Sequence, residues 1–203
     1  NSTITGDYTI GIKSEWLSLV GDVFGRYISG ISGDYLFHSV PYYSMSEEDL
    51  ELEEFNKLGE QASQGCVRLA VSDAKWVYDN CLTGTNVSIY DDAENAGPLG
   101  KPDAIKITDF TNKWDPTDSN KKCPYAKATP IISGANDYTI KSGGEFYALA
   151  GVTAVDTCGN DITSNIEVFG NVITTRKGKY KVTYSVTDVL KRTSSVTITV
   201  TVQ

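Results

Sequence analysis

Alternation of apolar and polar residues is the dominant pattern in the last third of the chain. A period of two places successive side chains on opposite faces of a strand, and closely spaced turn residues favour antiparallel pairing. The pattern therefore predicts an antiparallel β-sandwich over residues 130–203. The alternating segments are 130–133, 138–141, 166–169, 172–174, 178–188 and 194–202.

The first 92 residues show mixed patterns, with short strands and two helices. Strands are predicted at residues 7–12, at Tyr35–Val40 before Pro41, and at 86–90. Residues 16–27 carry many apolar side chains between glycines, which indicates a segment that covers the core or a wall of a groove.

Two helices are expected in the same region. Acidic residues crowd the start of residues 44–57, where the helix dipole favours them, and Ser46 with Asp49 resembles a capping box. The second helix, over residues 72–83, has Ser72 as its N-cap and Gly84 as its stop.

Proline, glycine and mixed charges mark residues 93–129 as a linker. Ile105 and Ile107 indicate a short strand within it, and we expect Trp114–Pro116 to dock on a neighbouring surface. The predicted organisation is therefore a domain over 1–92, a linker over 93–129 and a domain over 130–203.

Composition narrows the classes of partner. The chain has 203 residues, 40% of them apolar, and a net charge of −8, which argues against nucleic acid or an anionic membrane. No apolar run is long enough to span a membrane. The first residues read as the middle of a domain, so we expect upstream residues, including any export signal, to lie outside this sequence.

Four cysteines are present, and they call for different interpretations. Cys81 is expected to be a small buried residue, because no donor-rich loop surrounds it. Cys123 and Cys158 are predicted to form a disulfide that staples the linker to the second domain.

Cys66 is the candidate nucleophile. It follows Gly65 on a loop shortly before the second predicted helix, where a substrate backbone can approach closely. A nucleophilic thiol also needs a base and donors for the developing oxyanion. His38 is the one histidine of the chain, and backbone N–H groups around Gly65 and Cys66 are the candidate donors.

These residues carry a family resemblance. Ala62–Leu69, which reads Ala-Ser-Gln-Gly-Cys-Val-Arg-Leu, resembles the signature of the YkuD-type L,D-transpeptidases. The continuation Asp73–Tyr78, the pair His38–Ser39 and the stretch Thr5–Gly11 are similar to further parts of the family pattern. Gln64 departs from that pattern, which has a second histidine there. The resemblance implies a mainly β fold, a YkuD-type β-sandwich with short helices whose amino-terminal part is missing here.

The resemblance also implies a chemistry and a set of site residues. The expected catalytic residues are Cys66, His38 and Ser39, and the expected substrate-binding residues are Ser63, Gln64, Gly65 and Arg68. Cys66 would accept the acyl group of a peptidoglycan stem peptide as a thioester and pass it to an amine. No metal or organic cofactor is needed.

Two features of the site have more than one possible role. Arg68 pairs either with a substrate carboxylate or internally with Asp34 or Asp73. The acidic residues of 44–57 form a solvated face, or else attract an amino-group acceptor, and this insert between the catalytic elements is placed to act as a lid.

Two other functions compete with transpeptidation. An L,D-carboxypeptidase would use water in place of the amine. A non-catalytic cell-wall-binding protein would tolerate Gln64 and the missing amino-terminal strands.

Residues 130–203 resemble a bacterial Ig-like cell-surface domain, through phrases such as Ala154–Thr163 and Gly178–Tyr184. The resemblance implies a spacer or adhesion module without catalysis. Asp156, Asn160 and Asp161 are either Ca²⁺ ligands or ordinary turn caps, and turn caps are favoured. We expect a monomer at the cell wall or surface of a Gram-positive bacterium.

Overall fold

A computed structural model describes residues 3–92, 94, 97 and 100–203 of the chain. The chain forms two compact units, Asn1–Ala126 and Lys127–Gln203. Each unit has its own sheets and its own hydrophobic core. Within the described residues, no helix has the length and apolar character needed to cross a bilayer.

A four-stranded sheet forms the framework of the first unit, in the order β2-β3-β4-β5. Its β2, β3 and β4 are antiparallel, whereas β4 and β5 run parallel. A separate antiparallel pair joins β1 to β6. The strands are β1 (Gly6–Thr9), β2 (Lys13–Leu19), β3 (Val23–Ser32), β4 (Tyr35–Ser39), β5 (Val67–Leu69) and β6 (Asn86–Ile89).

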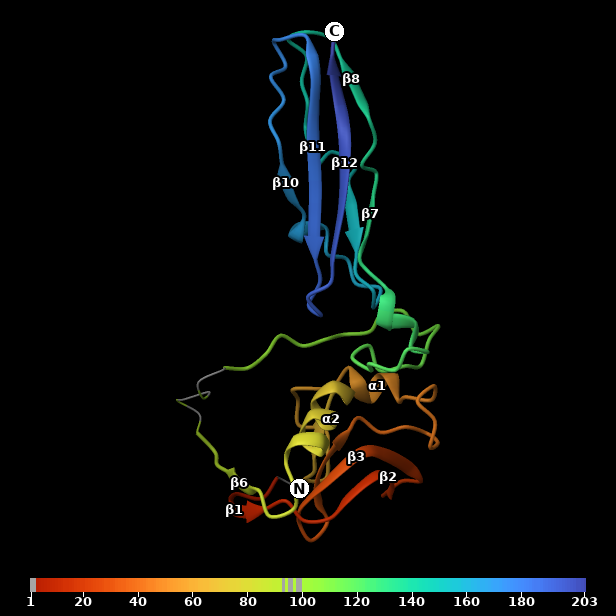
Figure 1. The fold of residues 1–203 in the computed structure, drawn as a ribbon, viewed down its shortest axis with the longest axis vertical. Helices are drawn as coiled ribbons and strands as arrows, with labels where there is room; N and C mark the ends of the chain where they lie inside the picture. Colours follow the sequence, from red (N-terminus) through yellow and green to blue (C-terminus); the bar gives the residue numbers. More distant parts are fainter. Residues whose placement is uncertain (1–2, 93, 95–96, 98–99) are drawn as a thin grey trace. The chain divides into compact units, whose positions relative to one another are not determined.

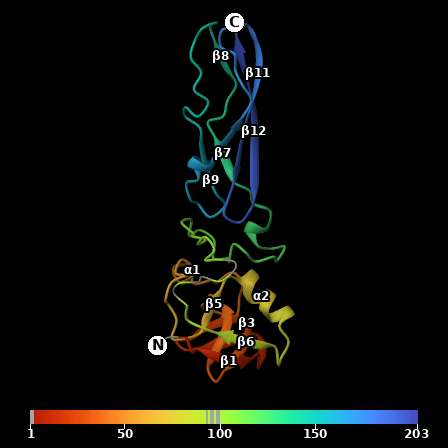
Figure 2. The same ribbon diagram turned by 90° about the vertical axis from the view of Figure 1, so that its left-hand side faces the viewer.

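Two helices accompany this sheet, α1 (Leu52–Phe55) and α2 (Val71–Asn80) (Figure 1). Helix α2 packs on β3 and β4, and Figure 2 shows it beside β5 and β3. Apolar side chains between the helices and the sheet form the core of the unit. Its fully or nearly fully buried members include Val40, Tyr42, Leu50, Phe55, Val71, Ala74 and Ile107.

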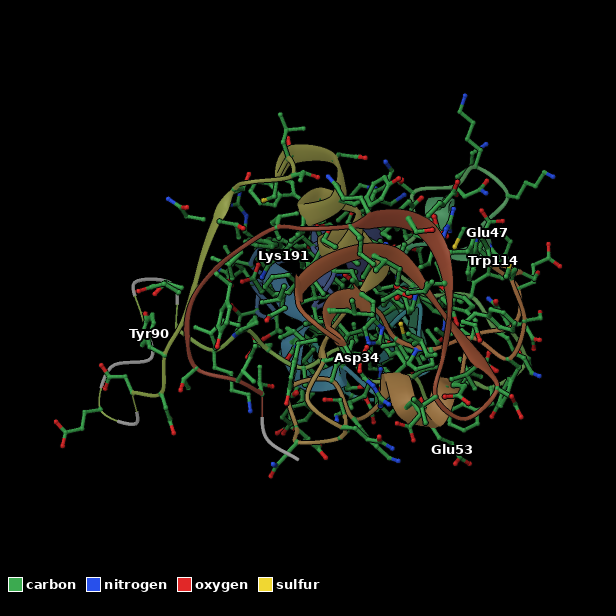
Figure 3. The ribbon with its side chains drawn as sticks, turned by 90° about the horizontal axis from the view of Figure 1, so that it is seen from below. Asp34, Glu47, Glu53, Tyr90, Trp114 and Lys191 are labelled. Atoms are coloured by element: carbon green, nitrogen blue, oxygen red, sulfur yellow. The ribbon has the colours of Figure 1, made fainter. Side chains whose placement is uncertain are left out.

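The first helix is much shorter than the predicted stretch 44–57. Ser46 begins a turn instead of a helix, because its carbonyl oxygen accepts the Asp49 N–H at 3.3 Å and its Oγ accepts the Glu48 N–H at 3.3 Å. The capping box is therefore wrong, and the helix begins only at Leu52, without a side-chain cap. The acidic Glu53 projects away from the unit (Figure 3).

Part of the predicted linker packs within the first unit. Ile107 is 1% exposed and belongs to its core, and Trp114 is also buried. The structure has no strand at Ile105–Ile107. Positions 93, 95–96 and 98–99 of the predicted linker, and positions 1–2 of the predicted first domain, lie outside the described residues.

The second unit contains two sheets, as expected for a sandwich. One has the order β10-β11-β12-β8, with β8 parallel to β12, and the other pairs β7 with β9 antiparallel. Inward side chains of β11 and β12, such as Tyr184 and Val200, are buried in its core. The strands are β7 (Ile131–Ser133), β8 (Tyr138–Ile140), β9 (Thr153–Val155), β10 (Glu167–Phe169), β11 (Gly178–Thr187) and β12 (Thr193–Val202). A short 3₁₀ helix occurs in this unit at Thr163–Asn165, and another, Pro124–Lys127, spans the boundary between the two units.

The predicted disulfide is wrong in this structure. None of the four cysteines is disulfide-bonded, and Cys123 and Cys158 are each buried within a different unit. The Cys123 Sγ lies 3.7 Å from the Asp115 carbonyl oxygen. Burial raises the pKa of the Cys158 thiol to about 12. Both cysteines are thus buried as thiols in the packing of their own units, without a disulfide.

Turn contacts occupy the candidate calcium ligands of the second unit. The Asp156 Oδ1 accepts the N–H groups of Cys158 and Asn160, both at 2.8 Å. The Asp161 Oδ1 accepts the Thr163 N–H at 2.8 Å. These contacts correspond to the turn-cap alternative.

Candidate active site

His38 lies on β4 and is 2% exposed. Its Nδ1 is 2.5 Å from the Ser39 carbonyl oxygen. A carbonyl can only accept, so Nδ1 carries the proton and the neutral imidazole keeps the lone pair of Nε2 for another partner. Burial is the main cause that lowers the pKa of His38 to about 4, and the Arg68 guanidinium adds to it. At neutral pH the ring is therefore a neutral base.

The space for this ring comes from Gly25 on β3. A Cβ at position 25 would lie 2.9 Å from Ile28 Cδ1 and 3.2 Å from His38 Nδ1. Ser39 connects β4 to β3 through its side chain. Its Oγ accepts the Arg26 N–H at 2.9 Å and donates to the Val40 carbonyl at 2.8 Å. Sequence reasoning missed Gly25, because its φ is ordinary and only tertiary packing reveals the need for a glycine.

Cys66 directly precedes β5, whose Val67 is paired with Phe37 of β4. In this register His38 lies opposite Arg68, two residues after Cys66. The Cys66 thiol donates to the carbonyl of Asp34 at 3.3 Å, a residue in the turn between β3 and β4. Across the described residues, no hydrogen bond joins the thiol to His38. The Asp34 carbonyl was not foreseen, because backbone acceptors leave no signal in a sequence.

The loop before Cys66 is held by Ser63. Its Oγ accepts the Gly65 N–H at 3.0 Å and donates to the Cys66 carbonyl at 2.6 Å. Gly65 has a φ of 130°, which only glycine adopts readily. The Gly65 N–H is thus already engaged, which leaves the Cys66 N–H as the candidate oxyanion donor. Gln64 is exposed on this loop.

Arg68 is paired inside the protein. Its Nη1 contacts Glu54 Oε2 on α1, and Glu54 Oε1 also pairs with Lys57 at 2.5 Å. The partner is therefore neither Asp34 nor Asp73. Glu54 is also one of the acidic residues expected to form a solvated face, and the ion pairs with these two cations help to lower the pKa of its carboxyl.

A cavity of about 280 Å³ opens beside Cys66. Residues 57–63 and Thr3 form one part of its lining, and Glu54, Val67 and Arg68 form another. Ser63 and Arg68, both expected to bind substrate, thus line the same space as the thiol. Its lining carries both signs of charge, negative from Glu54 and Glu60 and positive from Lys57 and Arg68.

Models of two known protein families match parts of this chain. Residues 1–89 match the family model of the L,D-transpeptidase catalytic domain, YkuD, and residues 130–202 match that of the bacterial surface protein Ig-like domain. The first unit carries a YkuD-family L,D-transpeptidase catalytic domain. An Ig-like domain of bacterial surface proteins follows it in the same chain.

Single relatives match parts of the chain. "Putative L,D-transpeptidase YciB" of Bacillus subtilis is 47% identical over 57 residues, which are 28% of this chain and 28% of YciB. The chain thus spans little more than a quarter of that relative.

Solved structures also match in part. The L,D-transpeptidase of Stackebrandtia nassauensis is 19% identical, with a TM-score of 0.34, over 45% of this chain and 40% of its own. A fused Zn-dependent amidase/peptidase/peptidoglycan-binding protein of Clostridium acetobutylicum is 36% identical, with a TM-score of 0.33, over 44% of this chain and 34% of its own.

Proposed function

We propose that this protein cross-links peptidoglycan as an L,D-transpeptidase, through a thioester on Cys66. The observation that supports it most is the placement of Cys66 at a cavity, beside the strand that carries a neutral imidazole whose Nδ1–H donates to the Ser39 carbonyl. Catalytic hydrogen bonds are often absent before substrate binds. In the reactive arrangement, the thiol no longer donates to the Asp34 carbonyl and donates instead to Nε2 of His38.

Acylation of Cys66 is the first step. Nε2 takes the thiol proton, and the thiolate attacks the carbonyl carbon that precedes the terminal D-alanine of a stem peptide. A C–S bond forms and the C–N bond breaks, while the imidazolium returns its proton to the leaving amine. The Cys66 N–H stabilises the oxyanion of the tetrahedral intermediate.

Transfer to an amine completes the reaction. The amine of a neighbouring stem attacks the thioester carbonyl and gives a proton to the neutral Nε2 of His38. A new C–N bond forms and the C–S bond breaks, and the released thiolate regains a proton from the imidazolium. If water takes the place of the amine, the product is a shortened stem, as in an L,D-carboxypeptidase. Product analysis with and without an amine acceptor separates the two reactions.

Substrate binding is assigned to the loop and to the charged wall of the cavity. Ser63 and Gly65 shape the loop, and exposed Gln64 offers an amide to the peptide backbone. Arg68 meets a substrate carboxylate only by sharing its guanidinium with Glu54. The Ig-like domain serves as a spacer at the bacterial surface, and we expect a monomer.

The test is covalent labelling of Cys66. We expect mass spectrometry to find one carbapenem adduct on the native chain and none on Cys66→Ala, which also loses all turnover of stem peptides. Cys81→Ala is the matched control, because Cys81 does not line the cavity, and it keeps both properties. Turnover that survives in Cys66→Ala would rule out the thioester. A native chain with neither adduct nor turnover would favour a wall-binding protein.

A further inference from the structure

Asn56 is hydrogen-bonded through both ends of its side-chain amide to a segment far along the chain. Its Nδ2 donates to the Ile107 carbonyl at 2.8 Å, and its Oδ1 accepts the Ile107 N–H at 2.7 Å. The amide thus pairs with the backbone as a neighbouring strand would. Ile107 is anchored by its own side chain, which is buried in the core of the first unit.

Two lysines extend this connection. The Lys101 Nζ donates to the Gly59 carbonyl at 2.9 Å. The Lys106 Nζ donates to the Asn56 carbonyl and lies 3.3 Å from Glu60 Oε1. Residues 101–107 therefore hold the loop 56–60 at several points along its length.

The loop that they hold is one wall of the cavity beside Cys66. Residues 57–63 line that cavity, and they begin immediately after Asn56. Residues 101–107 lie beyond the stretch 1–89 that matches the catalytic domain family. A segment outside the family-matched region thus contacts the loop that forms this wall.

We propose that Asn56 is a positioning residue, which sets the substrate-binding wall through its paired hydrogen bonds with Ile107. The proposal rests on the proposed function for the identity of the substrate, a peptidoglycan stem peptide. Asn56 does not touch the thiol or the imidazole, so it affects binding of the peptide and leaves the chemistry at Cys66 intact.

The experiment compares Asn56→Ala with the native chain. We expect the KM for a stem peptide to rise roughly five- to tenfold with little change in kcat, since the wall loses both hydrogen bonds to Ile107 and leaves its binding position part of the time. The alkylation rate of Cys66 by iodoacetamide is unchanged. Asn56→Asp recovers part of the KM, because a carboxylate oxygen still accepts the Ile107 N–H.

Asn112→Ala is the matched control. It removes the same amide, whose Oδ1 accepts only the local Trp114 N–H at 3.1 Å among the described contacts, and it leaves KM unchanged. Amide hydrogen exchange adds a readout that does not need turnover: residues 57–62 exchange faster in Asn56→Ala and not in Asn112→Ala.

The outcomes separate the two proposals. An unchanged KM in Asn56→Ala, or unchanged exchange at 57–62, overturns the positioning role. A native chain without turnover of stem peptides overturns the proposed function, and hydrogen exchange then still decides whether Asn56 holds the wall.

Discussion

The protonation state of His38 follows from its surroundings. The ring is buried, its Nδ1–H is held by the Ser39 carbonyl, and its pKa is lowered to about 4. An unfolded chain would titrate this histidine near the ordinary value of about 6.5. Between these two pH values the unfolded chain binds a proton that the folded chain does not bind.

This difference predicts a pH-dependent stability. Because the unfolded state binds more protons, the free energy of unfolding rises as pH rises from about 4 to 6.5, and then levels off. The contribution of His38 is at most about 3 kcal/mol. Urea unfolding of the native chain and of His38→Gln, at several pH values, isolates it as the difference between the two.

The difference between the native chain and His38→Gln does not contain the contributions of other buried titratable groups. Burial raises the pKa of the Asp115 carboxyl to about 6, so this group opposes the trend of His38 over much of the same range. It is present in both variants and cancels in the difference. A difference that stays flat from pH 4 to 7 would contradict a buried, neutral His38.

At the scale of single residues, the sequence reveals the reactive groups but not the residues that position them. Cys66 stands out by its glycine-bearing loop and His38 as the one histidine. The Asp34 carbonyl and the space at Gly25 depend on strands that meet only in the folded chain. The Glu54 partner of Arg68 comes from an insert whose path no local pattern specifies.

Helix α2 illustrates the same limit for a secondary structure element. The predicted range 72–83 is close to the observed Val71–Asn80, because the apolar spacing is a local property. Its predicted N-cap, Ser72, does not cap it. The Asp115 Oδ2 accepts the Val71 N–H at 2.9 Å, and the Thr117 Oγ1 accepts the Ser72 N–H at 3.0 Å. These caps come from residues more than 40 positions away, so the sequence next to the helix does not indicate them.

We therefore predict that Asp115→Ala destabilises the first unit. The change removes a helix cap and leaves a buried N–H without a partner, at a cost of roughly 2 kcal/mol. Urea unfolding at pH 7 measures the loss.

Asp109→Ala is the matched control, because Asp109 caps an exposed turn through Thr111. We expect it to shift the unfolding midpoint much less. Equal midpoints for the two variants would show that the Asp115 cap contributes nothing to stability.

The strands of the second unit were the most predictable elements. Alternation over 178–188 and 194–202 corresponds to β11 and β12, since exposed antiparallel strands show their two faces directly in the sequence. Residues 172–174 alternate as well, yet they form no strand. Short alternating runs do not reveal whether a partner strand is available.

The first unit extends beyond residue 92 because later residues make contacts with residues that are distant in the sequence. Asp118 carries one of them, because its Oδ2 lies 3.0 Å from Nη1 of Arg26, and both side chains are buried. A second guanidinium nitrogen of Arg26, Nη2, pairs with Glu47 at 2.7 Å. Glu47 also accepts a hydrogen bond from Asn120 at 3.2 Å, and Figure 3 shows Glu47 and Trp114 on the same side.

A chain that ends at residue 92, where the pattern of the sequence suggested a boundary, loses the contacts of Asp118 and Asn120 and, among these, keeps only the pair between Arg26 and Glu47. Removal of Asp118 takes one buried, charged hydrogen-bond partner from the Arg26 guanidinium, which keeps Glu47, at a cost of roughly 1.5–3 kcal/mol. Loss of the Ile107 side chain from the core costs about 2–5 kcal/mol more. The sum rivals the whole stability of a typical domain, which is about 5–15 kcal/mol.

We therefore expect residues 1–126 to unfold cooperatively in urea, and residues 1–92 to lack a cooperative transition and a near-ultraviolet circular dichroism signal. Residues 127–203 serve as the control, because they form a compact unit with their own core and should fold alone. If residues 1–92 unfold at the same urea concentration as 1–126, then residues 101–118 add no stability. In that case the contacts of Ile107, Asp115 and Asp118 follow from the fold of the first unit and do not support it.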